Sequence, residues 1–320
     1  MKSSNALLCL SLLTTLACSG GGGGGNSQPK PSYLGEATKP GYLPDGTQVQ
    51  ALTPEQVKEL TKSIGATAAI GAGFTKASGV QTSFGGSESA AAGDLSVGAD
   101  KALTAEVTEN LKSKCTVSKT ETKPQISGSS SSGSLYGSAR ASTTGYDCPL
   151  KSSLQADTSG SYSKSNSHLA INMTVKMQND YEIVGAGLSE KTGLTRGSSN
   201  LNVSVALNAN DRNQATIEAT GNTSGLWQFS NGTELKEKHL FEMSFASQSS
   251  SNTSGVIRMA LVYDFPSFKA LIQVFGTMNN GTLNAKTYIN GESADSNFGL
   301  GIANSNPAFQ SVLQQLAIQH

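Results

Sequence analysis

Histidine, the side chain most often used for proton transfer near neutral pH, occurs only three times in this chain. His168, His239 and His320 lie far apart, and none has the spacing of a metal-binding pair. The sequence also lacks His-Glu-x-x-His, Cys-x-x-Cys, the phosphate-binding Gly-x-x-x-x-Gly-Lys and the nucleophile turn Gly-x-Ser-x-Gly. His168 opens an alternating segment and is interpreted as a surface residue. We therefore predict a protein that is not an enzyme and has no metal site and no cofactor.

Two polar segments imitate functional motifs. Ser161-x-x-Lys164 and Lys191-Thr192-Gly193 resemble motifs of penicillin-binding proteins. In that family the nucleophile opens a buried helix, whereas Ser161 lies in a serine-rich strand or turn and the second motif follows too closely. The Asn-rich turn near Asn208 resembles a calcium loop, but Arg212 and Ala219 occupy positions that need oxygen ligands. Both segments are therefore interpreted as turns and strands without catalytic or metal-binding roles.

The first 25 residues have the pattern of an export signal. Lys2 precedes an apolar run over Ala6–Leu16, which small residues follow, and the run is too short to span a bilayer. Because the signal ends at Ala17-Cys18, it resembles the signal of bacterial lipoproteins. This resemblance implies cleavage before Cys18 and acylation of that residue. The alternative is ordinary secretion, with Cys18 in the part that is removed.

The lipoprotein resemblance also implies a location. It predicts a protein anchored by lipid in the outer membrane, on the periplasmic or the cell-surface face, because Ser19 rather than aspartate follows the cysteine. The expected partners are the membrane, through the N-terminal lipid, and other envelope or surface proteins. A chain with 23 basic and 23 acidic residues has no electrostatic reason to bind nucleic acid. The oligomeric state stays open.

Cys9 lies in the predicted signal and Cys18 is the predicted lipidation site, so two other cysteines remain to be explained. Cys115 and Cys148 form an even pair in a chain expected to be exported, which predicts a disulfide bond. The segment that such a bond would close is poor in large apolar residues, so covalent closure would help to order it. The alternative is a pair of buried free thiols.

The chain divides into four regions by composition. Residues 1–17 are the predicted signal, and residues 18–46 are a predicted lipid anchor and flexible tether rich in glycine and proline. Residues 47–115 are predicted to be a small helical region rich in glycine and alanine. Residues 116–320 are predicted to form an antiparallel β domain with a C-terminal helix.

Helical signals occur in three places. Thr53-Pro54-Glu55-Gln56 has an N-cap hydroxyl, a proline at the first helical position and a capping-box glutamine. A second helix is expected from Asp100 to about Lys112, and a third begins at Asn306 with apolar residues on one face. Beyond the first signal, small residues repeat every four positions, which suits either a membrane-inserting hairpin or a tightly packed or poorly ordered segment. These small residues are Gly65, Ala69, Gly73 and Ala77.

From about residue 116 to residue 303 apolar residues recur at every second position, the pattern of strands with one buried face. Asn-Gly pairs at Asn231, Asn280 and Asn290 favour tight hairpin turns. The sequence therefore predicts a mainly β fold, a long antiparallel meander of roughly nine to twelve strands that forms a curved sheet, a sandwich or an open barrel. The clearest alternating segments are His168–Gln178, Leu201–Ala209, Phe241–Phe245, Ile257–Phe265 and Leu283–Ile289.

Two functions are compatible with these observations. The first is a non-catalytic envelope lipoprotein that serves as an adhesion, scaffold or surface module on a flexible tether. The second is a carrier or binder of an apolar ligand, a lipid or a lipoprotein, in a curved-sheet cavity. A long curved sheet with helices over its open face resembles the general plan of periplasmic lipid and lipoprotein carriers. Met173, Met177, Met243 and Met259 would then line the cavity.

Overall fold

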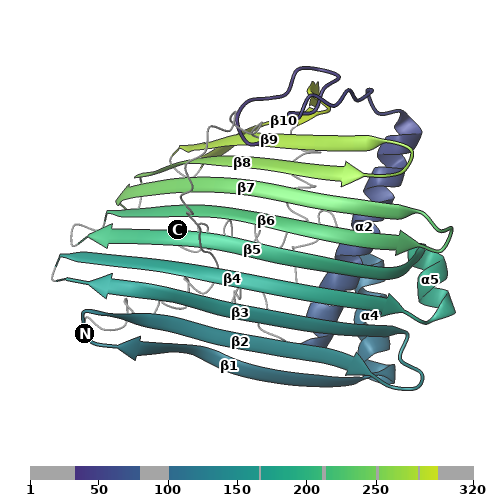
Figure 1. The fold of residues 1–320 in the computed structure, drawn as a ribbon, viewed down its shortest axis with the longest axis horizontal. Helices are drawn as coiled ribbons and strands as arrows, with labels where there is room; N and C mark the ends of the chain where they lie inside the picture. Colours follow the sequence, from purple (N-terminus) through teal and green to yellow (C-terminus); the bar gives the residue numbers. More distant parts are fainter. Residues whose placement is uncertain are drawn as a thin grey trace, which may run out of the picture.

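The computed structural model describes residues 33–79, 101–165, 167–210, 214–249, 252–279 and 282–294. These residues form 11 strands in a single sheet, and every strand pairs antiparallel with its neighbours in the sequence. The outermost strands do not pair with each other, so the sheet is open (Figure 1). The predicted mainly β antiparallel meander is thus confirmed, in the form of one open sheet. The strands are β1 (Thr116–Gly128), β2 (Ser132–Thr144), β3 (Leu150–Lys164), β4 (His168–Ile183), β5 (Leu194–Asn210), β6 (Ala215–Phe229), β7 (Glu234–Ser249), β8 (Asn252–Asp264), β9 (Lys269–Asn279), β10 (Thr282–Ile289) and β11 (Glu292–Ala294).

Two predictions fall outside the described residues. They are the signal with the lipidation site Cys18, and the C-terminal helix from Asn306. The Asn280-Gly281 turn lies outside as well. The other two Asn-Gly turns are described, and their glycines have positive φ angles of 82° at Gly232 and 84° at Gly291.

The two faces of the sheet differ because side chains alternate along each strand. We call the face toward the helices the inner face; its residues join those of the helices in one hydrophobic cluster. Fully buried inner-face residues include Leu150, Val203, Phe241, Leu261 and Ile272. The opposite face, the outer face, carries mostly Ser, Thr, Asn and charged residues.

Helices lie at one end of the strands (Figure 1). Helix α2 covers Pro54–Ser78, α4 covers Lys101–Lys114, and α5 is a single short helix at Ala186–Thr192. The capping box of α2 is formed: the Gln56 amide donates to Thr53 Oγ1 at 3.3 Å, and the Thr53 amide donates to Gln56 Oε1 at 2.9 Å. The helix continues through the small-residue stretch and ends before Gly79, which adopts the left-handed conformation.

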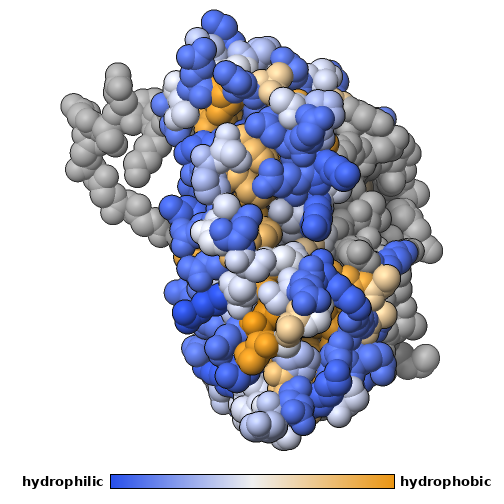
Figure 2. All heavy atoms as spheres, turned by 90° about the vertical axis from the view of Figure 1, so that its right-hand side faces the viewer, coloured by the Kyte–Doolittle hydropathy of each residue, from blue (hydrophilic) through white to orange (hydrophobic). Residues whose placement is uncertain are grey.

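The small residues of α2 permit close packing between helices. A Cβ atom built on Gly73 would lie 2.4 Å from Cγ1 of Val107 in α4, so only glycine fits this contact. Phe74 and Leu111 are fully buried beside it. This is the tightly packed alternative of the sequence interpretation. The end of the molecule where these helices lie has a mostly hydrophilic surface with scattered hydrophobic residues (Figure 2).

Residues 33–50 form a strap that packs on the outer face of β8 and β9. Leu43 is 5% exposed and forms a cluster with Ala260 and Leu271. The fully buried side chain of Gln273 accepts a hydrogen bond from the Thr38 amide at 3.0 Å and donates one to the Tyr33 carbonyl at 2.8 Å. The strap is therefore held by both apolar and polar contacts.

The strap corrects one predicted boundary. The sequence predicted a flexible tether through Gly46, but residues 33–46 are packed on the sheet. The reason is that a few apolar residues, Tyr33, Leu34 and Leu43, find partners more than 200 positions away. Glycine and proline content alone does not report such long-range contacts.

Aromatic rings lie over glycines on the inner face. Gly197 in β5 faces Trp227 in β6, and a Cβ built on Gly197 would lie 2.1 Å from Cε3 of the indole. The same arrangement pairs Gly221 with Phe241. Ring cover of this kind offsets the weak intrinsic strand preference of glycine and fixes the register of the paired strands.

Gly197→Ala is expected to destabilise the protein by about 1–3 kcal/mol, because the added methyl group must displace the Trp227 ring from a packed core. Urea unfolding followed by tryptophan fluorescence measures this change. Gly187→Ala is the matched control, since a Cβ at Gly187 in α5 has no neighbour within 4 Å and a helical alanine is intrinsically favoured. Equal effects of the two substitutions would contradict the ring-over-glycine explanation.

Candidate functional site

A polar cluster interrupts the apolar inner face. On β7 the inner-face positions are Leu235, Glu237, His239, Phe241 and Met243, so two ionisable residues stand in an otherwise apolar series. The sheet register places Glu237 opposite Gly225 and Tyr263, and it places His239 opposite Thr223 and Leu261. The cluster, defined here as Thr67, Thr223, Trp227, Glu237, His239 and Tyr263, therefore spans β6, β7 and β8 beneath α2.

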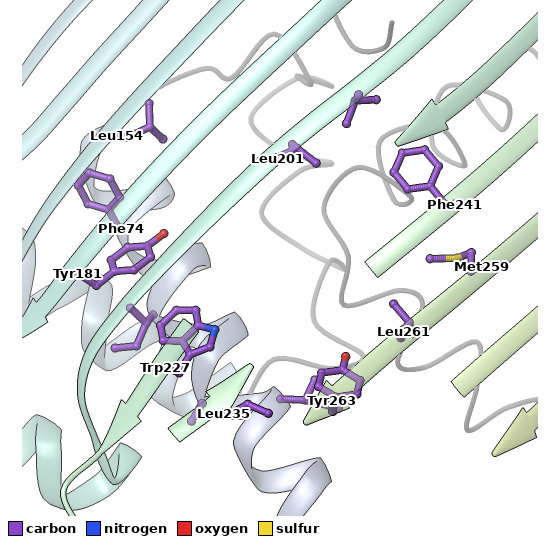
Figure 3. Close-up of a cluster of buried hydrophobic side chains, with 14 of the residues drawn as sticks. Phe74, Leu154, Tyr181, Leu201, Trp227, Leu235, Phe241, Met259, Leu261 and Tyr263 are labelled. Atoms are coloured by element: carbon purple, nitrogen blue, oxygen red, sulfur yellow. The ribbon is translucent and has the colours of Figure 1, made fainter. Parts of the chain in front are cut away.

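Helix and sheet meet at Glu237. The Thr67 hydroxyl of α2 donates to Glu237 Oε1 at 3.4 Å. A Cβ built on Gly225 would lie 3.0 Å from Trp227 Nε1 and 3.1 Å from Glu237 Oε2, so the missing side chain leaves room for the indole and the carboxyl group. Figure 3 shows the rings of Trp227 and Tyr263 on the inner face with Leu235 between them. The indole also stacks on Tyr181, with ring centroids 5.6 Å apart.

Burial dominates the electrostatics of the cluster. It raises the pKa of Glu237 to about 7, and the polar hydrogens of Trp227 and Thr67 offset only part of that increase. Burial also lowers the pKa of His239 to about 4, so the imidazole is neutral at pH 7. The pKa of Tyr263 is raised well above its usual value, first by burial and then by Glu237.

Several polar atoms of the cluster lack a hydrogen-bond partner among the described residues. They are Trp227 Nε1, His239 Nε2 and Thr223 Oγ1, and each of these atoms is buried. The Trp227 side chain still favours the charged form of Glu237, since it offsets part of the increase in the pKa of that group. Buried polar atoms without partners cost about 1–3 kcal/mol each, so native proteins rarely keep them without a reason. Three of the six such atoms found among the described residues lie around one carboxyl group, which makes this cluster the candidate binding site.

The predicted site residues have different outcomes. Cys115 and Cys148 form the predicted disulfide bond, with Cα atoms 4.7 Å apart. His168 is exposed at the start of β4, as expected for a surface residue. Lys191 forms an ion pair with Glu106 of α4 at 2.7 Å. Within the described ranges, no group of three or more His, Cys, Asp or Glu side chains is arranged to hold a metal ion.

The sequence interpretation missed the Glu237–His239 cluster. It treated His239 only as one of three isolated histidines and read the alternating segment from Phe241 onward. The sequence did contain a signal for this site. When the alternation that begins at Phe241 is extended back to Leu235, every second residue faces the core, and these residues include Glu237 and His239. Polar residues at core positions of a strand mark either an internal network or a ligand site.

Comparisons of the chain with protein-family models, with curated proteins and with solved structures find no match. The function is therefore argued from the fold and the cluster.

None of the helices in the described part of the chain is long and apolar enough to cross a membrane.

Proposed function

We propose that this protein is a lipid-anchored envelope protein that binds an apolar or amphipathic ligand against the inner face of its open sheet. The observation that carries this proposal is the polar cluster on the largely apolar inner face, where three buried polar atoms lack a hydrogen-bond partner among the described residues. A core that served packing alone would be expected to satisfy or omit such groups. The proposed activity is binding or carriage, without catalysis.

The proposed anchor is Cys18, acylated after removal of the signal. Because the strap begins by Tyr33, the proposed tether consists of residues 19–32. A flexible chain of this length has a root-mean-square reach of about 20 Å, which would keep the domain close to the membrane surface. Such proximity suits a protein that exchanges a poorly soluble ligand with a bilayer in the outer membrane.

Cys18→Ser is expected to remove the protein from the outer-membrane fraction and to give an unprocessed or soluble product, because two or three acyl chains give stable anchorage and their loss removes it. Fractionation and intact-mass measurement of wild type and variant test this expectation. A Cys18→Ser protein that still fractionates with the outer membrane would show that the anchor lies elsewhere.

The same variant tests ligand binding cleanly. Because Cys18→Ser carries no covalent lipid, any lipid that organic solvent extracts from the purified protein must have been bound non-covalently. We expect mass spectrometry of the extract to detect one lipid class in near-stoichiometric amount. An extract free of lipid, from protein with native circular dichroism, would contradict the proposed ligand.

A second candidate function is the adhesion, scaffold or surface module. The outer face favours it, because small polar residues form cross-strand rows there, such as Thr174, Ser204 and Thr220 on β4, β5 and β6. This row of small polar side chains could contact another envelope or surface protein. Substitution of Thr174 and Thr220 by lysine should abolish partner capture under this function and leave ligand binding unchanged.

A further inference from the structure

Glu237 has no basic partner in the part of the chain that the structure describes. It takes part in none of the ion pairs found there. The ionisable groups around it are His239 on its own strand and Tyr263 on β8, with Tyr181 beyond the Trp227 indole. The three lysines of α2, Lys58, Lys62 and Lys76, are exposed to solvent. An inward-facing carboxyl group without a cation is the feature that requires explanation.

Three acceptor atoms belong to side chains that are neighbours in the sheet. Thr223 lies directly opposite His239, and Glu237 is two residues before His239 on the same face, so the three side chains are nearest neighbours across β6 and β7. The neutral imidazole accepts through Nε2 when its proton is on Nδ1. Together, Glu237 Oε2, His239 Nε2 and Thr223 Oγ1 offer acceptors for three donors.

The cluster also keeps accessible surface. Thr223, Glu237 and His239 are only partly buried, although the surrounding residues are almost completely buried. The almost completely buried residues are Phe241 and Leu261 beside the cluster and Trp227 and Tyr263 within it, each 4% exposed or less. His239 Nε2 and Thr223 Oγ1 are themselves buried, so a group bound to them is shielded from water.

Building on the proposed function, we infer that Glu237, His239 and Thr223 bind the head group of an amphipathic amine. The ammonium group has three N–H donors and a positive charge, which match the three acceptors and the unpaired carboxylate. The apolar body of the ligand contacts the hydrophobic residues that surround the cluster on the inner face. A phosphate or carboxylate head is rejected, because it would place a second negative charge beside Glu237.

Three probes with the same apolar chain and different heads test this inference: octylamine, octanol and octanoate. They are titrated into the full mature protein in lipid nanodiscs, and binding is followed by the emission of Trp227, the sole tryptophan in the sequence. We expect octylamine to bind about tenfold more tightly than octanol, as one charge-assisted hydrogen bond provides, and octanoate to bind more weakly than either.

Variants assign the effect to the cluster. Glu237→Gln should weaken octylamine binding about tenfold and leave octanol binding unchanged. Thr223→Val, which removes one acceptor and keeps the carboxylate, should weaken octylamine less. Glu218→Gln is the matched control, because it makes the same charge change on the exposed outer face of β6. Circular dichroism of each variant verifies the fold.

Three other outcomes would each contradict a specific part of this inference. Equal binding of octylamine and octanol by wild type would overturn the amine assignment and leave the proposed apolar-ligand function standing. Equal weakening by Glu237→Gln and Glu218→Gln would show a general charge effect and would also overturn it. Failure of all three probes to bind the folded protein would reject the proposed function itself.

Discussion

Replacing both Cys115 and Cys148 by serine is expected to lower the free energy of unfolding by about 4 kcal/mol, on the chain-entropy estimate for a loop of this length. The disulfide joins the residue that follows α4 to the turn between β2 and β3, 33 positions further along the chain. It therefore ties the helical layer to the first strands of the sheet.

The expected loss is local because the first two strands bury little large apolar surface. Their inner-face positions include the small residues Ala139 and Ala141, and Ile126 and Tyr136 are each 47% exposed. Ordering a residue costs about 1–2 kcal/mol. The apolar area that the first two strands bury offsets less of this cost than the apolar area that the later strands bury. The later strands hold Trp227 and the phenylalanines, so they retain a core of their own.

Hydrogen exchange on the double variant measures this difference. We expect protection to fall over residues 116–165 and in α4 and to persist beyond residue 200. Wild-type protein treated with a reductant serves as a control, since it should reproduce the pattern without any substitution. A uniform loss of protection along the chain, or free thiols in the native protein, would contradict the prediction.

Glu237→Gln and His239→Gln are expected to give stability profiles that slope in opposite directions with pH. In wild type, the pKa of Glu237 is 4.5 in the unfolded chain and about 7 in the folded protein. Between these values the folded carboxyl group keeps a proton that the unfolded one has lost, so stability falls as pH rises. At 1.36 kcal/mol per pKa unit the total loss is about 3 kcal/mol.

His239 contributes the opposite slope. Its pKa falls from 6.5 in the unfolded chain to about 4 in the folded protein. As pH falls between these values the unfolded chain binds a proton that the folded protein does not, so stability falls as pH decreases, again by about 3 kcal/mol. The two contributions oppose each other between pH 4.5 and 6.5, and their sum in wild type is nearly flat there.

Each single variant shows the pH dependence of stability that comes from the one ionisable group that remains. Glu237→Gln should become more stable as pH rises from 4.5 to 6.5, and His239→Gln should become less stable over the same interval. Urea unfolding at several pH values measures both profiles, and the double variant should be as flat as wild type. The neighbouring tyrosines titrate far above this interval. Parallel profiles of the two single variants would show that the groups are not buried as described.

Local features were predictable from the sequence because local physics produces them. Alternation of apolar residues gives strands with one buried face, and Asn-Gly turns join consecutive strands, so the meander follows from short-range patterns. The α2 capping box needs only Thr53 and Gln56, which lie in one helical turn. The disulfide followed from an even pair of cysteines, Cys115 and Cys148, in a chain predicted to be exported.

The remaining features depended on contacts between distant parts of the chain. The strap is held by Gln273 and Leu271, more than 200 residues away, and no local pattern encodes that pairing. The sequence alone determined that the chain forms an antiparallel meander with a capped helix and one disulfide. Only the tertiary structure decided that Thr67 of α2 meets Glu237 and that this carboxyl group has no ion-pair partner among the described residues. The reason is that burial and charge partners arise when separate elements pack together.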